Sequence, residues 1–302
     1  MKNIIIILLV FWSNLIYGLT FDLPKNGNNL IGEPIIAKVI YNEDFSDIAS
    51  RFGVGYYEVL EANPGIDPDE PPTDIVLIIP TQYILPRELT EKKNIIVVNI
   101  AEMRLYYQQE NKIYIYPVGV GRKGWDTPLG IMTVVRKVKN PTWHVPDSIY
   151  KFRQTMGLKV NKIVPPGPDN PLGKHALYLS VEGNMIHGTN TNYGIGKRSS
   201  AGCLRLYEND IAELYNLVTI GTKVVIINRP YKADWIDGKL YLEAHMPLSE
   251  QRLKLDNDTK PALDIVTKIA NTHNVVVDWQ KVDMVTKEHL VVPRVVSLES
   301  NG

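Results

Sequence analysis

The sequence predicts a mostly β domain with a few short helices, preceded by a small α+β unit. Two observations support this prediction. Downstream of residue 93, runs rich in β-branched and aromatic residues follow one another at short spacing, with turn residues between them. Upstream, residues 36–80 show a strand, two short helical patterns and a second strand. The four β-rich runs are residues 95–100, 103–107, 113–120 and 131–138.

The small upstream unit is predicted from its apolar periodicity. Apolar residues recur at i, i+3, i+4 and i+7 between Phe45 and Phe52, which is the buried stripe of a short helix, and Gly53 ends it. A second short helix is expected over residues 54–62, and a closing strand over residues 75–80. The unit is therefore expected to have the order strand, helix, helix, strand.

The other segments divide into connections and further elements. Residues 19–35 and 83–93 contain prolines, glycines or mixed charges, so we expect an irregular lead-in and a linker there. The proline-rich segment 164–173 is either a rigid surface loop or a wall of a site. Further strands are expected at residues 176–181, 223–227, 239–243 and 275–279, and helices from residue 209 onward and over residues 261–271.

The composition is that of a neutral globular protein. With 302 residues and 44% hydrophobic content, the chain should form two or three packed units. Lys plus Arg and Asp plus Glu each number 33, so the formal net charge is zero. Because a neutral chain has no general electrostatic attraction for nucleic acid or anionic lipid, no nucleic-acid partner is expected.

The N-terminus departs from this average. Met1-Lys2-Asn3 precedes an apolar run over residues 4–12, and polar sequence begins near Asp22. The run is shorter than the roughly 20 residues that a membrane-spanning helix needs, so residues 1–18 are predicted to be a cleaved signal peptide. The mature protein is then exported, and contact with the membrane is limited to the signal peptide before cleavage.

Cys203 is the only cysteine, and fifteen residues separate it from His187 of the segment His187-Gly188-Thr189. A solitary thiol cannot form an internal disulfide, and a nearby histidine could activate it as a nucleophile. Small residues at Ala201 and Gly202 let the backbone approach, and the amides of Gly202 and Cys203 could form an oxyanion hole. The alternative is an inert buried cysteine, and spacing alone leaves both interpretations open.

No metal site is expected from the sequence. The six histidines include no His-x-x-x-His pair, and there is no second cysteine to complete a zinc site. The chemistry of Cys203 also requires no cofactor.

Several linked motifs resemble the L,D-transpeptidase (YkuD-type) family. Its active-site pattern, His-Gly-Thr followed by Ser-x-Gly-Cys-x-Arg, is matched by His187-Gly188-Thr189 and Ser200-Ala201-Gly202-Cys203-Leu204-Arg205. Residues 36–81 resemble a LysM module, including its closing Leu-Ile-Ile-Pro. A periplasmic subgroup of the family carries a signal peptide and such a module, and the likeness covers residues 1 to about 245. The resemblance implies a β-sandwich catalytic domain.

Carried over residue by residue, the resemblance implies Cys203 as nucleophile and His187 as its base. Gly188 would orient His187 through its carbonyl, while Ser200 and Arg205 would shape the pocket, with Arg205 suited to a carboxylate. Many family members have histidine where this chain has Ala201. We therefore expect activity to persist with an altered pocket polarity.

The resemblance implies peptidoglycan as the substrate, in the periplasm. The thiolate would attack the carbonyl of the third, diamino acid residue of a tetrapeptide stem and release D-alanine. The acyl group would pass to another stem, to a lysine of an outer-membrane lipoprotein, or to water, which is L,D-carboxypeptidase activity. Carbapenems would inactivate the enzyme by acylating Cys203, and the LysM-like module would bind glycan strands. The competing hypothesis is a non-catalytic peptidoglycan-binding envelope protein.

The expected domain boundaries follow from these motifs. They are residues 1–18 for the signal peptide, 36–81 for the LysM-like module, 93–229 for the catalytic domain and 230–302 for a C-terminal extension whose role the sequence does not indicate.

Overall fold

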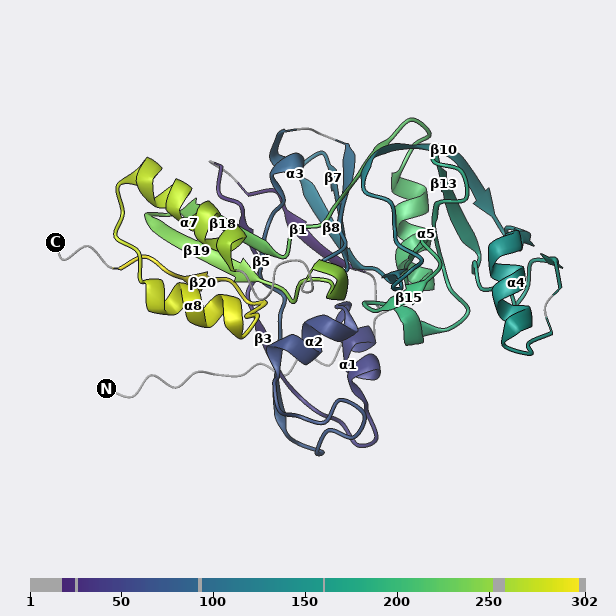
Figure 1. The fold of residues 1–302 in the computed structure, drawn as a ribbon, viewed down its shortest axis with the longest axis horizontal. Helices are drawn as coiled ribbons and strands as arrows, with labels where there is room; N and C mark the ends of the chain where they lie inside the picture. The colour runs from purple at the N-terminus through teal and green to yellow at the C-terminus, as the bar shows by residue number, and fades with distance from the viewer. Residues whose placement is uncertain (1–17, 25–26, 92–93, 160, 252–258, 299–302) are drawn as a thin grey trace.

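The computed structural model describes residues 18–24, 27–91, 94–159, 161–251 and 259–298. The signal peptide predicted for residues 1–18 therefore falls, except for Gly18, outside the described residues. Within the described residues the chain forms a central β-rich domain flanked by two smaller units (Figure 1). No helix in that part of the chain is long and apolar enough to cross a membrane.

The central domain is built on one mixed sheet of nine strands. Its order is β1-β8-β7-β6-β17-β10-β13-β14-β16, so the β-rich runs share one hydrogen-bonded sheet. The largest apolar core covers one face together with helix α5 (Glu208–Leu217). The strands are β1 (Leu19–Asp22), β6 (Ile95–Asn99), β7 (Arg104–Gln109), β8 (Lys112–Pro117), β10 (Gly130–Lys139), β13 (His175–Leu179), β14 (Met185–His187), β16 (Leu204–Arg205) and β17 (Lys223–Ile227).

Two segments expected to be irregular belong to this domain. The lead-in contributes β1, which pairs with β8, and β2 (Leu30–Ile31), which pairs with β5 (Tyr83–Ile84). The expected linker contains β5 and helix α3 (Arg87–Glu91), and Leu89 is buried in a core on the sheet. The linker prediction was wrong. It relied on the proline and the mixed charges of this segment, whereas the apolar side chains between them pack on the sheet.

The N-terminal unit consists of β3 (Ile35–Lys38), α1 (Phe45–Phe52), α2 (Tyr56–Ala62) and β4 (Val76–Ile79), and the two strands pair antiparallel. Asp44 and Asp47 form a capping box at the start of α1. Gly53 follows α1 with φ of 65°, a left-handed conformation that favours glycine. This unit packs around its own small apolar core.

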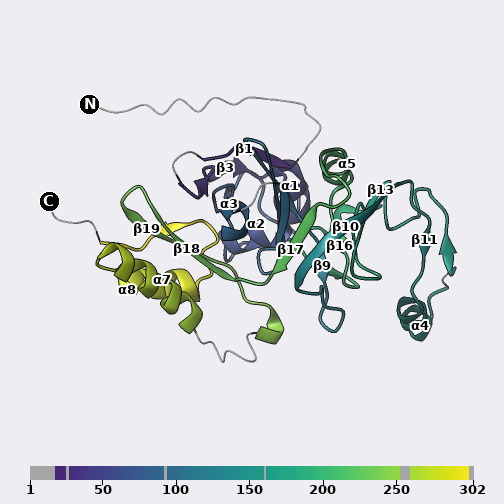
Figure 2. The same cartoon turned by 90° about the horizontal axis from the view of Figure 1, so that it is seen from above.

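The C-terminal residues fold into a third unit with its own apolar core. Helices pack on a small antiparallel sheet, as the two perpendicular views show (Figure 2). The strand expected at residues 275–279 is wrong: only Val277 forms an isolated bridge, and α8 begins at Trp279. The elements are β18 (Tyr231–Ile236), β19 (Lys239–Ala244), β20 (Arg294–Val295), α7 (Lys260–His273) and α8 (Trp279–Lys287).

An arm projects from the central domain between β10 and β13. It consists of the pair β11 (Trp143–His144) and β12 (Ile163–Val164), with helix α4 (Asp147–Thr155) between them. Figure 1 shows α4 at the edge of the molecule farthest from the C-terminal unit. Three smaller elements complete the central domain: β9 (Val120–Gly121) and β15 (Arg198–Ser200), which pair in parallel, and the 3-10 helix η1 (Asn192–Gly194), which contacts β15 and α1.

The three units meet at a buried group of charged side chains, which we call the junction cluster. Arg104 of β7 is 1% exposed and lies 2.9 Å from Glu58 of α2. Lys232 of β18 lies 3.0 Å from both Glu102 and Glu243. The members of the junction cluster are Glu58, Glu102, Arg104, Lys232, Glu243 and His245.

Candidate active site

The two motifs around His187 and Cys203 come together because β14 and β16 are parallel neighbours. Ile186 pairs with Leu204 and His187 pairs with Arg205. Cys203 therefore lies one residue before β16, beside the end of β14. Arg205 of β16 also forms an antiparallel bridge with Gly119.

A cavity of about 530 Å³ opens over these strands. It contains every site residue that the sequence predicts except Gly188, which lies directly behind His187. Residues 200–203 form its floor together with His187 and Arg205. Its walls come from the arm and from the loops on either side: Trp125, Asp126, Pro128, Trp143, His144, Pro146, Ser148, Ile149, Pro171, Leu172 and residues 181–185.

His187 is held as a neutral base. Its side chain is 3% exposed, and Nδ1 lies 2.7 Å from the Gly188 carbonyl oxygen. Since a carbonyl only accepts, Nδ1 carries the proton and Nε2 is free to accept one. Burial, followed by the positive charge of Arg205, lowers the pKa of His187 to about 3. The predicted orienting role of Gly188 agrees with this contact.

Gly188 lies close to the side chain of Glu208. A Cβ atom at position 188 would lie 2.4 Å from Oε2 of Glu208, so a larger residue there would displace this carboxylate. Glu208 in turn accepts hydrogen bonds from the Lys174 amide and lies 3.2 Å from Nδ1 of His175. The start of α5 is thus packed directly behind the base.

Cys203 rests as a thiol. Burial raises its pKa, while the Met185 amide, which donates to the sulfur, and the charge of Arg205 act in the opposite direction. Sγ donates a weak hydrogen bond to the Gly183 carbonyl oxygen at 3.4 Å. With a neutral base and a raised thiol pKa, the resting site favours the neutral pair, and the thiolate–imidazolium pair is expected only during attack.

The turn before Cys203 is fixed by Ser200. Its hydroxyl donates to the Cys203 carbonyl oxygen at 2.6 Å and accepts from the Gly202 amide at 3.2 Å. Gly202 has φ of 100°, and a Cβ there would lie 3.3 Å from the Asp126 carbonyl oxygen. Ser200 therefore fixes the turn at the edge of the cavity, and its hydroxyl occupies one of the two amides expected in the oxyanion hole.

Arg205 and Ala201 both face the cavity. Nε of Arg205 is buried and has no hydrogen-bond partner among the described residues. An unpartnered buried N–H group is unfavourable, so this guanidinium is suited to a ligand in the cavity. Ala201 places a small, uncharged side chain at the cavity.

The proline-rich segment forms a wall of the site. Pro171 and Leu172 line the cavity. The neighbouring Asn170 is fully buried, and its amide group donates to the Pro141 carbonyl oxygen at 2.8 Å and accepts from the Leu172 amide at 2.9 Å. Asn170 therefore ties this segment to the base of the arm.

Sequence reasoning missed Arg198, which connects the C-terminal unit to the cavity wall. Its guanidinium donates to both carboxylate oxygens of Glu250, at 2.7 and 2.8 Å. It also donates to Asp126 at 3.2 Å and to the Gly121 carbonyl oxygen at 3.0 Å. Nothing in the local sequence indicates these contacts, because the partners are far apart in the chain.

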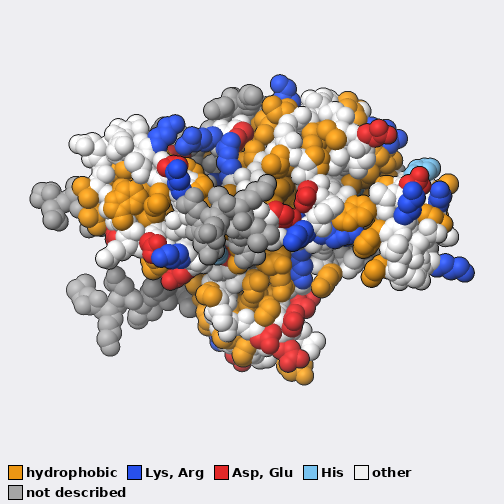
Figure 3. Space-filling model, in the orientation of Figure 1, with side chains coloured by type: hydrophobic (Ala, Val, Ile, Leu, Met, Phe, Trp, Pro, Cys, Tyr) orange, Lys and Arg blue, Asp and Glu red, His pale blue; other side chains and the backbone are white. Residues whose placement is uncertain are grey.

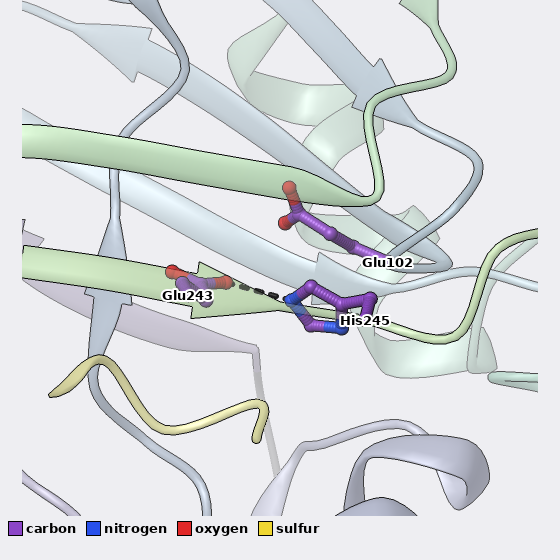
Figure 4. Close-up of side chains that lie close together, drawn as sticks. All are labelled: Glu102, Glu243 and His245. Carbon is purple, nitrogen blue, oxygen red and sulfur yellow. Dashed lines mark hydrogen bonds and ion pairs between the residues drawn. The ribbon is translucent and has the colours of Figure 1, made fainter. Parts of the chain in front are cut away.

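The junction cluster contains a group with the ligand types of a metal site. Glu102, Glu243 and His245 place three ligand atoms within 4.8 Å of one another (Figure 4). However, Lys232 and Arg104 already supply the positive charge to these carboxylates. The cluster is therefore a structural ion network, and its residues do not fit a metal.

Comparisons with known proteins agree with the site. A family model described as the L,D-transpeptidase catalytic domain (YkuD) matches residues 93–226. The chain is 40% identical to probable L,D-transpeptidase ErfK/SrfK of Salmonella typhimurium over 84% of this chain and 82% of that protein. It is 43% identical to probable L,D-transpeptidase YcfS of Escherichia coli over 79% of this chain and 75% of that protein.

Among solved structures, the chain is similar to L,D-transpeptidase 3 of Mycobacterium tuberculosis. The identity is 18%, the TM-score is 0.35, and the match covers 44% of this chain and 60% of that one. The sequence relatives are far closer, and they cover more than two thirds of both chains. The protein therefore belongs to the L,D-transpeptidase family with a YkuD-type catalytic domain.

Proposed function

We propose that the protein transfers the acyl group of a peptidoglycan tetrapeptide through a thioester on Cys203. The observation that carries this proposal is that Cys203, the neutral base His187 and the unpartnered Arg205 line one cavity. Their order on adjacent parallel strands matches the motif of the family to which the chain belongs.

In the first half-reaction the thiol proton passes to Nε2 of His187 as sulfur bonds to the carbonyl carbon of the third stem residue. The oxyanion is stabilised by amides of the turn, of which that of Cys203 is the better candidate because Gly202 donates to Ser200. The C–N bond then breaks, and the proton on His187 moves to the leaving D-alanine amine. A thioester on Cys203 remains.

In the second half-reaction an amine attacks the thioester, loses a proton to His187, and expels the thiol. If the amine belongs to a second stem, a cross-link between two third residues forms. If it is a lysine of an outer-membrane lipoprotein, the envelope is tethered to the wall. Water in place of the amine gives L,D-carboxypeptidase activity.

The proposed setting is the periplasm. An N-terminal signal peptide and a LysM-like unit at residues 36–81 would bring the catalytic domain to the wall and hold it on glycan strands. The support for this part is the sequence pattern, together with the strand-helix-helix-strand arrangement around a separate apolar core.

The test is to incubate the purified mature protein with disaccharide-tetrapeptide and to measure two products by mass spectrometry. We expect an acyl adduct on Cys203 and one released D-alanine for each adduct. Addition of an amine acceptor or its omission then separates transfer from hydrolysis.

The control is Cys203→Ala, which should retain the wild-type melting temperature and give neither product. Wild-type protein that binds glycan but forms no adduct and releases no D-alanine would instead support a non-catalytic envelope protein. A carbapenem adduct on Cys203 offers a second readout that does not depend on the choice of peptide.

A further inference from the structure

Charge is distributed unevenly around the cavity. Residues 121–174, which include the arm, contain ten Lys or Arg and three Asp or Glu, although the whole chain contains 33 of each. Residues 40–74 of the N-terminal unit show the reverse, with nine acidic residues and one basic residue. Figure 3 shows basic side chains over the arm and acidic side chains on the N-terminal unit. Three of the ten basic residues lie on β10, and the other seven lie on the arm and in the adjacent connecting segments, which also supply walls of the cavity.

Arg122 lies where the arm meets the loop that precedes β10. Its guanidinium carbon is 4.9 Å from the ring centre of Trp125 and 4.9 Å from that of Phe152 on α4. The two rings contact each other edge to face at 5.8 Å. Trp125 lines the cavity, so Arg122 is fixed at the rim by two aromatic rings.

Arg153 is held in a similar way on the other wall. Its guanidinium carbon lies 5.2 Å from the ring centre of Trp143, which also lines the cavity. Across the described part of the chain, neither Arg122 nor Arg153 has a carboxylate within ion-pair distance. By contrast, Arg104 and Arg198 pair with acidic residues.

Both arginines act electrostatically on the catalytic floor. The pKa of Arg205 is lowered, first by burial and then by the positive charges of Arg122 and Arg153, against the effect of Cys203. Arg205 therefore lines the cavity, while Arg122 and Arg153 lie against the lining residues Trp125 and Trp143; the lining also includes Asp126, which pairs with Arg198, and Glu182. Such an arrangement creates a positive potential that attracts anions.

We propose that Arg122 and Arg153 are specificity-determining residues that bind carboxylate groups of the peptides entering the cavity. The proposal rests on the acyl-transfer function above and adds the feature of the substrate that is recognised. Stacking on a ring uses the face of a guanidinium and leaves its edge N–H groups free, and these match a carboxylate in two-point contact. The carboxylate could belong to the acyl donor or to the amine acceptor.

The test compares charged and neutralised substrates in the full-length mature enzyme. Donor tetrapeptides carry free carboxylates or have them amidated one at a time, and acceptors are an amino acid or its amide. We expect Arg122→Gln and Arg153→Gln each to lower kcat/KM roughly tenfold for the carboxylate substrate, the usual effect of removing a charged hydrogen bond. For the matching amide the loss should be less than about twofold. If the carboxylate and amide forms differ for the donor, the arginines bind a carboxylate of the donor; if they differ for the acceptor, the arginines bind that of the acceptor.

Arg136→Gln is the matched control. Arg136 also stacks on an aromatic ring, that of Tyr178 at 3.8 Å, but neither residue lines the cavity. This variant should transfer acyl groups from all substrates at the wild-type rate. Raising the salt concentration should weaken the wild-type preference for carboxylate substrates and leave the Gln variants almost unchanged.

If the Gln variants lost kcat/KM equally for carboxylate and amide substrates, the two arginines would only stabilise the arm. A kcat/KM unchanged from the wild type would also overturn the proposal. Binding of the same peptides to Cys203→Ala, with and without Arg122→Gln, tests recognition independently of turnover. Salt-sensitive binding that Arg122→Gln removes would uphold the proposal even if no transfer is seen. Cys203 acylation without any carboxylate preference would uphold the enzyme and reject the recognition.

Discussion

The cavity around Cys203 and the junction cluster both bury charged or polar side chains. They differ in whether these side chains have ion-pair or hydrogen-bond partners within the protein. In the junction cluster each charge faces an opposite charge, as Arg104 faces Glu58 at 2.9 Å and Lys232 faces Glu243 at 3.0 Å. In the cavity, Nε of Arg205 is buried and has no hydrogen-bond partner among the described residues. The difference indicates that the junction stabilises the fold, whereas the cavity keeps polar groups available for a substrate.

This comparison predicts that variants of the two regions will separate activity from stability. The largest effect on activity after loss of the thiol should come from His187→Gln. Removal of a general base usually lowers the rate by about 10²- to 10⁴-fold, so kcat for acyl transfer should fall by that factor. The melting temperature should change little, because Gln can also donate to the Gly188 carbonyl oxygen.

The pH dependence of Cys203 alkylation sharpens the same prediction. His187, with a pKa of about 3, is neutral throughout the neutral range, and burial raises the pKa of Cys203. Reaction with iodoacetamide should therefore increase with pH, with a midpoint above about 8.5, the ordinary thiol value. A plateau extending from pH 5 to 8 would reveal a resting thiolate–imidazolium pair and contradict the neutral site.

The largest effect on stability should come from Arg104→Met. It leaves Glu58 and Glu102 buried without this partner, which usually costs about 3 to 5 kcal/mol in the free energy of unfolding. Chemical denaturation at neutral pH measures this loss, and Lys287→Ala is the control. Lys287 pairs with Asp283 on the surface of α8, so its removal should cost under about 0.5 kcal/mol. Equal effects of the two variants would contradict the structural role of the junction.

A smaller effect is expected at Glu61, which faces His245 at the edge of the junction at 3.7 Å. Burial raises the pKa of Glu61 to about 7, against the opposing charge of His245. The folded state then holds a proton that the unfolded state has lost, so this contribution to stability disappears as pH rises from about 4.5 to about 7. Glu61→Gln should remove that pH dependence and be more stable than the wild type at pH 8, by about 1 to 3 kcal/mol.

Unfolding measured at pH 5 and pH 8 provides the comparison for Glu61. At pH 5 the carboxyl group is protonated in the folded state, so wild type and Glu61→Gln should be nearly equal. A wild type whose stability rises between these pH values with no change in the Gln variant would show that the sign is wrong.

The sequence was informative where function depends on neighbours in the chain. His187 ends β14 and Cys203 directly precedes β16, and these two strands are parallel neighbours joined by a short segment. The small residues Ala201 and Gly202 likewise indicated a close approach of the backbone beside Cys203, and both line the cavity. The apolar periodicity likewise located α1, whose buried residues fall on one face.

The sequence was uninformative where contacts join distant segments. The junction cluster combines α2, β7 and β19, and no local pattern indicates that Glu58 and Glu243 will share Arg104. Helix α4 was missed because none of its residues is buried, so it has no apolar stripe to detect. The aromatic contacts of Arg122 depend on this helix and were therefore also invisible.

Glu250 provides the smallest expected effect, because it acts on the cavity wall only through Arg198. It lies between β19 and α7 of the C-terminal unit, outside the junction cluster, and pairs with Arg198, which also pairs with Asp126 in the cavity wall. The hydrogen bonds from Arg198 lower the pKa of Glu250 to about 2, so the pair persists throughout the neutral range. Its side chain is 32% exposed, which limits the expected contribution to stability to at most about 1 kcal/mol.

Glu250→Ala should therefore leave the melting temperature and the alkylation of Cys203 almost unchanged, since a small reagent does not need the wall. It should lower kcat/KM for peptide transfer by about two- to fivefold, because a displaced wall positions the peptide less well. Glu250→Gln, which can still accept one hydrogen bond from Arg198, should recover part of the loss. If Glu250→Ala transferred peptides with wild-type kinetics, the C-terminal unit would support only the fold. If kcat/KM for peptide transfer fell while alkylation of Cys203 did not change, the C-terminal unit would also support the site.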